Sequence, residues 1–148
     1  MIKYLVLIFI SFNCFALQIE DLMRFGRFTN GTRCKDIISS IGHPRFTYNS
    51  DGFTSMSYVS VLFACEDQFD LLRQIYVFPE VTSSYIGNAT KIFRMNKDDV
   101  ITSFGTPYEE RNKRIYYRYT NETNEVIADI QIAFYSTGSV RSYSVVFF

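Results

Sequence analysis

The chain has 148 residues, with 15 basic and 15 acidic side chains, one histidine and 18% aromatic residues. The balanced charge, with no basic block, disfavours a nucleic acid or an anionic membrane surface as partner. With a single histidine, a catalytic triad or a histidine-containing metal site would have to use that one residue.

The first 16 residues have the pattern of a secretory signal peptide. Lys3 precedes an apolar run that is too short to span a bilayer, and the small residues Cys14 and Ala16 precede a polar stretch. We expect cleavage after Ala16. An uncleaved membrane anchor and a lipid attached to Cys14 are the two alternatives. The prediction is an exported protein, periplasmic or secreted, which would associate with a membrane only through a retained or lipidated N-terminus.

Two cysteines remain after residue 16, Cys34 and Cys65. In an oxidising compartment a single pair of cysteines is most simply a disulfide. The alternative is two buried free thiols. We predict the disulfide, which would close a loop of about 31 residues and stabilise the fold by roughly 2–4 kcal/mol.

The first half of the remaining chain contains two helical patterns followed by strand patterns. Residues 17–28 have apolar side chains at helical spacing, and residues 34–41 predict a second short helix. Residues 43–52 are rich in turn formers and predict a loop. Alternation over residues 54–65 predicts one strand, and residues 71–78 predict the strand that returns from it.

The second half repeats this order. Residues 79–84 are the best candidate for a linker, and residues 85–93 are ambiguous because their helical pattern is poor. Asn96 is a typical helix cap, with acidic residues in the first turn that follows. Three strand patterns end the chain, at residues 115–120, 126–135 and 140–148.

One nine-residue stretch occurs in both halves. Residues 36–44 read DIISSIGHP, and residues 99–107 read DVITSFGTP. Each copy indicates a short helix that stops at a glycine in a left-handed conformation (Gly42, Gly105), with a proline two residues later (Pro44, Pro107). An echo of this length at a period of about 60 residues predicts a duplicated unit.

These patterns together predict an α+β fold of two tandem units. Each unit consists of helix, helix and an antiparallel meander, with the helices packed on one face of the sheet and the other face left uncovered. The expected boundaries are a signal peptide at 1–16, a first unit at 17–80 and a second unit at 81–148.

The sequence from Gly31 to Pro44 resembles the opening of SmpA/OmlA domains, the family that includes the outer-membrane assembly lipoprotein BamE. The resemblance depends on a glycine, a helix with apolar residues at its centre and an ending of the form apolar-Gly-x-Pro. The later parts of the family pattern would be an aromatic strand residue (Tyr58 or Tyr117) and strands that end at Phe63 and Phe134. Two such units in tandem are also similar to the β-lactamase inhibitor protein. The second unit departs from the pattern, with Arg94 in place of the first glycine. The resemblance implies outer-membrane assembly or inhibition of a target enzyme.

The sequence has few residues in patterns typical of catalytic sites, so we expect no enzymatic activity, no cofactor and no bound metal. His43 lies inside the Gly-x-Pro turn, where the other copy has Thr106, so the fold does not require an imidazole there. The sequence contains no glycine-rich phosphate loop and no cluster of Cys and His with metal-ligand spacing.

The sequence has more residues of the kinds that bind other proteins. Strand alternation predicts tyrosine, arginine and apolar side chains on the sheet face away from the helices, and such residues commonly anchor protein interfaces. The candidate partner-binding residues are Tyr58, Leu62, Tyr116, Arg118, Tyr135 and Phe148. The partner would be an envelope protein or a target enzyme. Two alternatives remain open: an internal contact between the two units, and a structural or membrane-associated envelope protein without a discrete target.

Overall fold

Short helical segments open each half of the chain in the computed structural model, which describes residues 16–80 and 83–148. They are the 3₁₀ helix η1 (Ile19–Met23) and the helix α1 (Cys34–Ile41), then α2 (Ser83–Ile86), the 3₁₀ helix η2 (Gly87–Arg94) and α3 (Lys97–Phe104). The helix predicted over residues 17–28 is therefore limited to one short 3₁₀ segment. The predicted cap of α3 is confirmed: the Asn96 side chain accepts a hydrogen bond from the backbone N–H of Asp99 at 3.0 Å.

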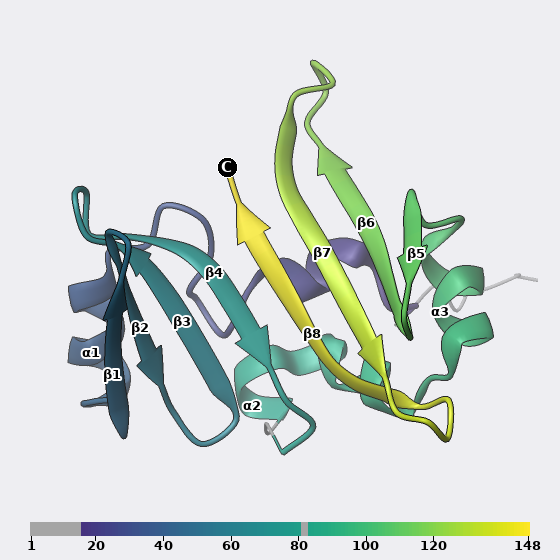
Figure 1. Cartoon of the computed structure of the whole chain (residues 1–148), viewed down its shortest axis with the longest axis horizontal. Helices are drawn as coiled ribbons and strands as arrows, with labels where there is room; N and C mark the ends of the chain where they lie inside the picture. Colours follow the sequence, from purple (N-terminus) through teal and green to yellow (C-terminus); the bar gives the residue numbers. More distant parts are fainter. Residues whose placement is uncertain (1–15, 81–82) are drawn as a thin grey trace, which may run out of the picture.

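Eight strands follow these helices, four in each half. They are β1 (Phe46–Ser50), β2 (Phe53–Ser57), β3 (Val61–Glu66), β4 (Leu71–Val77), β5 (Glu109–Arg111), β6 (Arg114–Thr120), β7 (Val126–Phe134) and β8 (Val140–Phe147). All of them join one antiparallel sheet in the order β1-β2-β3-β4-β8-β7-β6-β5, so that β1 and β5 form its edges (Figure 1). The two halves meet where β4 pairs with β8.

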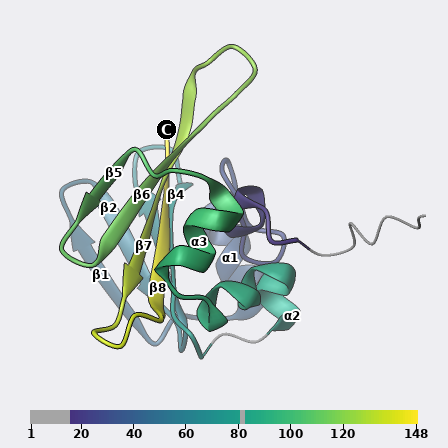
Figure 2. The same cartoon turned by 90° about the vertical axis from the view of Figure 1, so that its right-hand side faces the viewer.

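The helices lie on one side of this sheet, and the other side carries none of the described helices (Figure 2). The buried side chains form one cluster between the sheet and the helices, which includes Phe63, Ile75, Ile132 and Tyr143. The α+β class and the one-sided helix layer are thus as predicted. The cluster draws on both halves. The division at residue 80 stays a prediction, because residues 81–82 lie outside the described part, as does the signal segment up to residue 15.

The strand prediction was wrong at two places in the first half. Residues 43–52 are not a loop: β1 lies there and pairs with β2 through the two-residue turn Asp51–Gly52. The single strand predicted over residues 54–65 is two strands, β2 and β3, joined at residues 58–60. The linking residues Tyr58, Val59 and Ser60 include no glycine, proline, aspartate or asparagine, so the alternating pattern gave no sign of the turn.

The repeated helices end in the same geometry. Gly42 has φ 88° and ψ −176°, and Gly105 has φ 83° and ψ −169°. The sequence predicted a left-handed conformation, but a positive φ combined with ψ near 180° is a region that essentially only glycine occupies. A tyrosine closes each corner: Tyr58 donates its hydroxyl to the carbonyl of Gly42 at 2.8 Å, and Tyr117 donates to Gly105 at 2.9 Å.

We expect Gly105→Ala to destabilise the protein by about 1–3 kcal/mol through backbone strain alone. A Cβ atom at this position would meet no other atom within 4 Å, so the effect does not include a steric clash. The measurement is chemical denaturation followed by tyrosine fluorescence, with Ser103→Ala on the exposed side of α3 as control. Equal stability of the two variants would contradict the strained-corner assignment.

The predicted disulfide is present. Cys34 at the start of α1 is bonded to Cys65 in β3, and their Cα atoms lie 6.2 Å apart. The bond fastens the first helix to the sheet. Intramolecular disulfides of this kind are typical of oxidising, extracytoplasmic compartments.

Candidate interaction surface

The helix-free side of the sheet, called the open face below, collects exposed aromatic side chains. Strand residues alternate between the two faces of a sheet. Members of the buried cluster point to the helices, and the residues next to them in each strand point to the open face. One row of paired residues on the open face runs Tyr48, Ser55, Ala64, Gln74, Val146, Asp129 and Arg118. The adjacent row runs Phe46, Ser57, Leu62, Tyr76, Ser144, Gln131, Tyr116 and Glu109.

A shallow hollow of about 540 Å³ occupies the first-half side of the open face. Its lining combines small residues such as Ser55 and Ala64, aromatic residues such as Tyr48 and Phe148, and the ion-paired Glu66 and Arg73. Tyr48 is 69% exposed and Phe148 is 61% exposed. Small and aromatic side chains around a hollow can receive an apolar side chain from a partner.

The second-half side of the open face is built around Arg118. Its guanidinium binds both carboxylate oxygens of Asp129, at 2.9 and 3.2 Å, and it lies over the ring of Tyr108, 4.6 Å from the centroid. The hydrogen bond to Asp129 raises the pKa of Arg118 above its ordinary value. Tyr116 packs beside Tyr108, with ring centroids 6.3 Å apart. The result is an ordered cation–aromatic group at the surface.

A more polar band separates these two ends along β4, β8 and β7. The hydroxyls of Tyr76 and Ser142 lie 3.0 Å apart within hydrogen-bond distance, and Gln74 and Gln131 lie in the neighbouring positions. The open face therefore offers two aromatic ends joined by groups that can form hydrogen bonds. This composition is usual for interfaces that form and dissociate.

Four of the six sequence-predicted binding residues lie on the open face: Leu62, Tyr116, Arg118 and Phe148. The placement of Tyr58 was wrong, because its ring packs edge-on against buried Phe63 and its hydroxyl binds Gly42 on the helix side.

Tyr135 was also misplaced. It follows the end of β7 and lies with Lys97 of α3 and Ile115 around a separate hollow on the helix side. β7 ends at Phe134, so the strand alternation on which the prediction depended does not extend to Tyr135. Sequence reasoning missed Phe46, Tyr48, Phe53 and Tyr108. The first two belong to β1, whose strand character a stricter reading of the Asp51–Gly52 hairpin signal would have found.

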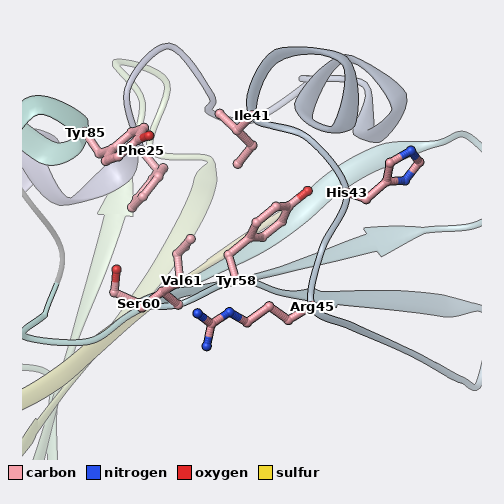
Figure 3. Close-up of a pocket in the computed structure, with 9 residues that line it drawn as sticks. Phe25, Ile41, His43, Arg45, Tyr58, Ser60, Val61 and Tyr85 are labelled. Carbon is pink, nitrogen blue, oxygen red and sulfur yellow. The ribbon is translucent and has the colours of Figure 1, made fainter.

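A second hollow, of about 270 Å³, lies on the helix side near Tyr58 (Figure 3). Phe25 and Tyr85 stack at its inner end, with centroids 5.2 Å apart. His43 lies at the margin and points away from those rings (Figure 3). The residues that line this hollow include no carboxylate and no cysteine.

The described residues contain neither a metal-binding cluster nor a membrane-spanning helix. No group of three or more His, Cys, Asp or Glu side chains there is arranged to hold a metal ion. No helix within residues 16–80 and 83–148 is both long and apolar enough to cross a membrane.

Comparison with known proteins shows similarity at the level of fold. No protein-family model and no curated protein matches the chain. A cysteine-rich secretory protein of Staphylococcus aureus has 13% identity and a TM-score of 0.51, over 79% of this chain and 44% of that one. A DUF4309 family protein of Bacillus subtilis (YjgB) has 8% identity and a TM-score of 0.50, over 83% of this chain and 81% of that one. The chain thus spans less than half the length of the staphylococcal protein.

Proposed function

We propose that the protein is an exported, non-enzymatic interaction module that binds a protein partner through its open face. The observation that carries the proposal is the one-sided construction of the sheet, in which the described helices cover one face (Figure 2). Exposed side chains on the other face include Phe46, Tyr48 and Arg118. Soluble monomers rarely expose large contiguous apolar patches without an interaction that uses them.

Export is supported by the Cys34–Cys65 disulfide and by the signal-like pattern at residues 1–16. The staphylococcal structure with a similar fold is described as a secretory protein. The tandem arrangement of two units and the relationship to SmpA/OmlA domains are both part of this proposal. The matching corners at Gly42 and Gly105, each closed by a tyrosine hydroxyl, support a duplicated unit. Under this proposal the role is that of an assembly factor or a secreted inhibitor.

A structural envelope protein is the second candidate function. The strand with the greatest aromatic exposure, β1, has no charged residue, which would also suit contact with a membrane or a cell wall. The ordered Arg118–Asp129 pair and the polar band favour a protein partner instead, because lipid tails cannot satisfy those groups.

The test uses capture of the native partner by the exported chain and by matched tyrosine variants. We expect Tyr48→Ala with Tyr116→Ala to weaken capture at least about tenfold, because exposed tyrosines at an interface often act as hot spots. Both side chains are solvent-accessible, so stability should change by less than about 1 kcal/mol. Tyr135→Ala is the control: it removes the same side chain from the helix side.

The outcome separates the two candidate functions. A discrete stoichiometric partner that is lost with the double variant and retained with Tyr135→Ala supports the interaction module. Sedimentation with membranes that detergent reverses, with no captured protein, would support the structural role. A large loss of stability in the double variant would show that the open face is an internal packing surface.

A further inference from the structure

The two edges of the sheet differ in how well they are protected against pairing with another chain. The edge strand β5 has three residues, all charged, and its side chains form ion pairs with Lys97 and within the strand, between Arg111 and Glu109. The edge strand β1 has five residues, Phe-Thr-Tyr-Asn-Ser, with no charge, no proline and no glycine. Edge strands in stable monomers usually carry the protection seen in β5, and β1 lacks it.

The free backbone groups of β1 follow from its hairpin with β2. Asp51 and Gly52 both have positive φ, at 51° and 81°, as a two-residue type I′ turn requires. Such a turn closes on a hydrogen-bonded pair, here Ser50 with Phe53, and pairs then alternate along an antiparallel ladder. Tyr48 therefore exchanges its bonds with β2, whereas Thr47 and Asn49 direct their N–H and C=O groups away from the sheet.

We propose that a second copy of this chain occupies the β1 edge, forming an antiparallel two-fold dimer. Centring the axis on Tyr48 pairs Thr47 of each copy with Asn49 of the other. Each of these pairs brings together outward N–H and C=O groups, as an antiparallel ladder requires. No shift of the register by one residue can do this.

The same register is complementary in charge. It places Arg45, which precedes β1, opposite Asp51 of the second copy, and the two-fold axis makes this contact twice. Neither residue has an ion-pair partner within the part of the chain that the structure describes, and both are exposed. Tyr48 would lie opposite its own copy on the open face. Phe46 and Tyr48 are 73% and 69% exposed, the two highest values among the large hydrophobic side chains described.

Sedimentation velocity of the exported chain over a range of concentrations tests the proposal. We expect a monomer–dimer equilibrium, and Thr47→Pro should raise its dissociation constant at least about tenfold, because proline removes an outward N–H group while leaving the β1–β2 bonds intact. Glu110→Pro is the matched control. It removes the outward N–H of β5 and should leave the dimer unchanged.

A charge-exchange experiment separates a specific contact from loss of folding. Arg45→Glu and Asp51→Lys should each abolish self-association, because each variant places like charges opposite one another. Mixed together, they should form a heterodimer, in which both contacts again join opposite charges. A lysine can adopt the positive φ that this turn requires, since Lys113, at the second position of the corresponding β5–β6 turn, has φ 61°.

Amide hydrogen exchange locates the interface. Protection of the Thr47 and Asn49 amides should rise with protein concentration, whereas the Tyr48 amide should be protected throughout. A chain that stays monomeric at about 0.5 mM, where even a dimer with a high-micromolar dissociation constant would form, would overturn the proposal. So would a dimer that Thr47→Pro and Glu110→Pro weaken equally, or variants that fail to complement. The variants at Arg45, Thr47 and Asp51 leave the aromatic side chains of the open face in place, so their effect on self-association can be told apart from a loss of partner capture.

Discussion

Phe63→Ala should lower the free energy of unfolding by about 3–5 kcal/mol, as expected for removing a fully buried phenylalanine. Phe63 lies in β3 with no solvent exposure, at the point where the first helical segments meet the sheet. Its ring contacts those of Phe25, Phe28 and Tyr58 in edge-on geometry, at 5.4, 6.0 and 5.8 Å between centroids. The substitution would leave a cavity that these three rings cannot fill without leaving their own contacts.

Urea denaturation of the oxidised protein provides the measurement, and Leu62→Ala provides the control. Leu62 is the neighbouring residue in β3, on the open face and partly exposed. Its truncation should cost less than about 1.5 kcal/mol, because less apolar surface is lost and no closed cavity forms. Equal costs for the two variants would mean that the helix layer does not pack on this face.

Removing the disulfide should have the second largest effect. Cys34→Ala with Cys65→Ala should cost about 3–4 kcal/mol, because a bond across 31 residues restricts the unfolded chain to that extent in the chain-entropy account. For a domain of this size that loss corresponds to a fall in melting temperature of roughly 10 °C. Thermal unfolding monitored by circular dichroism gives the value.

Reduction of the native protein gives an independent comparison for the disulfide. Treating the unsubstituted protein with dithiothreitol should lower its melting temperature to that of the double variant. The same treatment should leave the melting temperature of the double variant unchanged. A native protein whose melting temperature is insensitive to reductant would show that the bond contributes nothing to the folded state. Both cysteines are buried, so full reduction should be verified by thiol labelling after unfolding.

The features that could be predicted from sequence are local ones. The helices α1 and α3 have short apolar stripes, and their ends are marked by Gly42 and Gly105, so their bounds followed directly. The alternation in β7 was clear enough to assign Ile130 and Ile132 to the helix side. The disulfide followed from the cysteine count once export was inferred. Each of these signals is contained within a few residues or in the composition.

The features that could not be predicted depend on contacts between distant segments. Nothing in β4 or β8 alone indicates that these strands pair and unite the two halves into one sheet. The turn at residues 58–60 has no glycine, proline, aspartate or asparagine, so Tyr58 was placed on the wrong face. β1 was assigned to a loop because its polar residues resemble turn formers, and the most exposed aromatic residues were missed with it.

Site-specific photocrosslinking in the cell that makes the protein tests the central claim most directly. A photoreactive phenylalanine analogue would replace Phe148, Tyr116 or, as the control on the helix side, Tyr135. The account predicts a covalent adduct of one defined mass, containing a single protein, from the two open-face positions and none from position 135. Adducts with lipid alone, or the same protein adduct from all three positions, would contradict it.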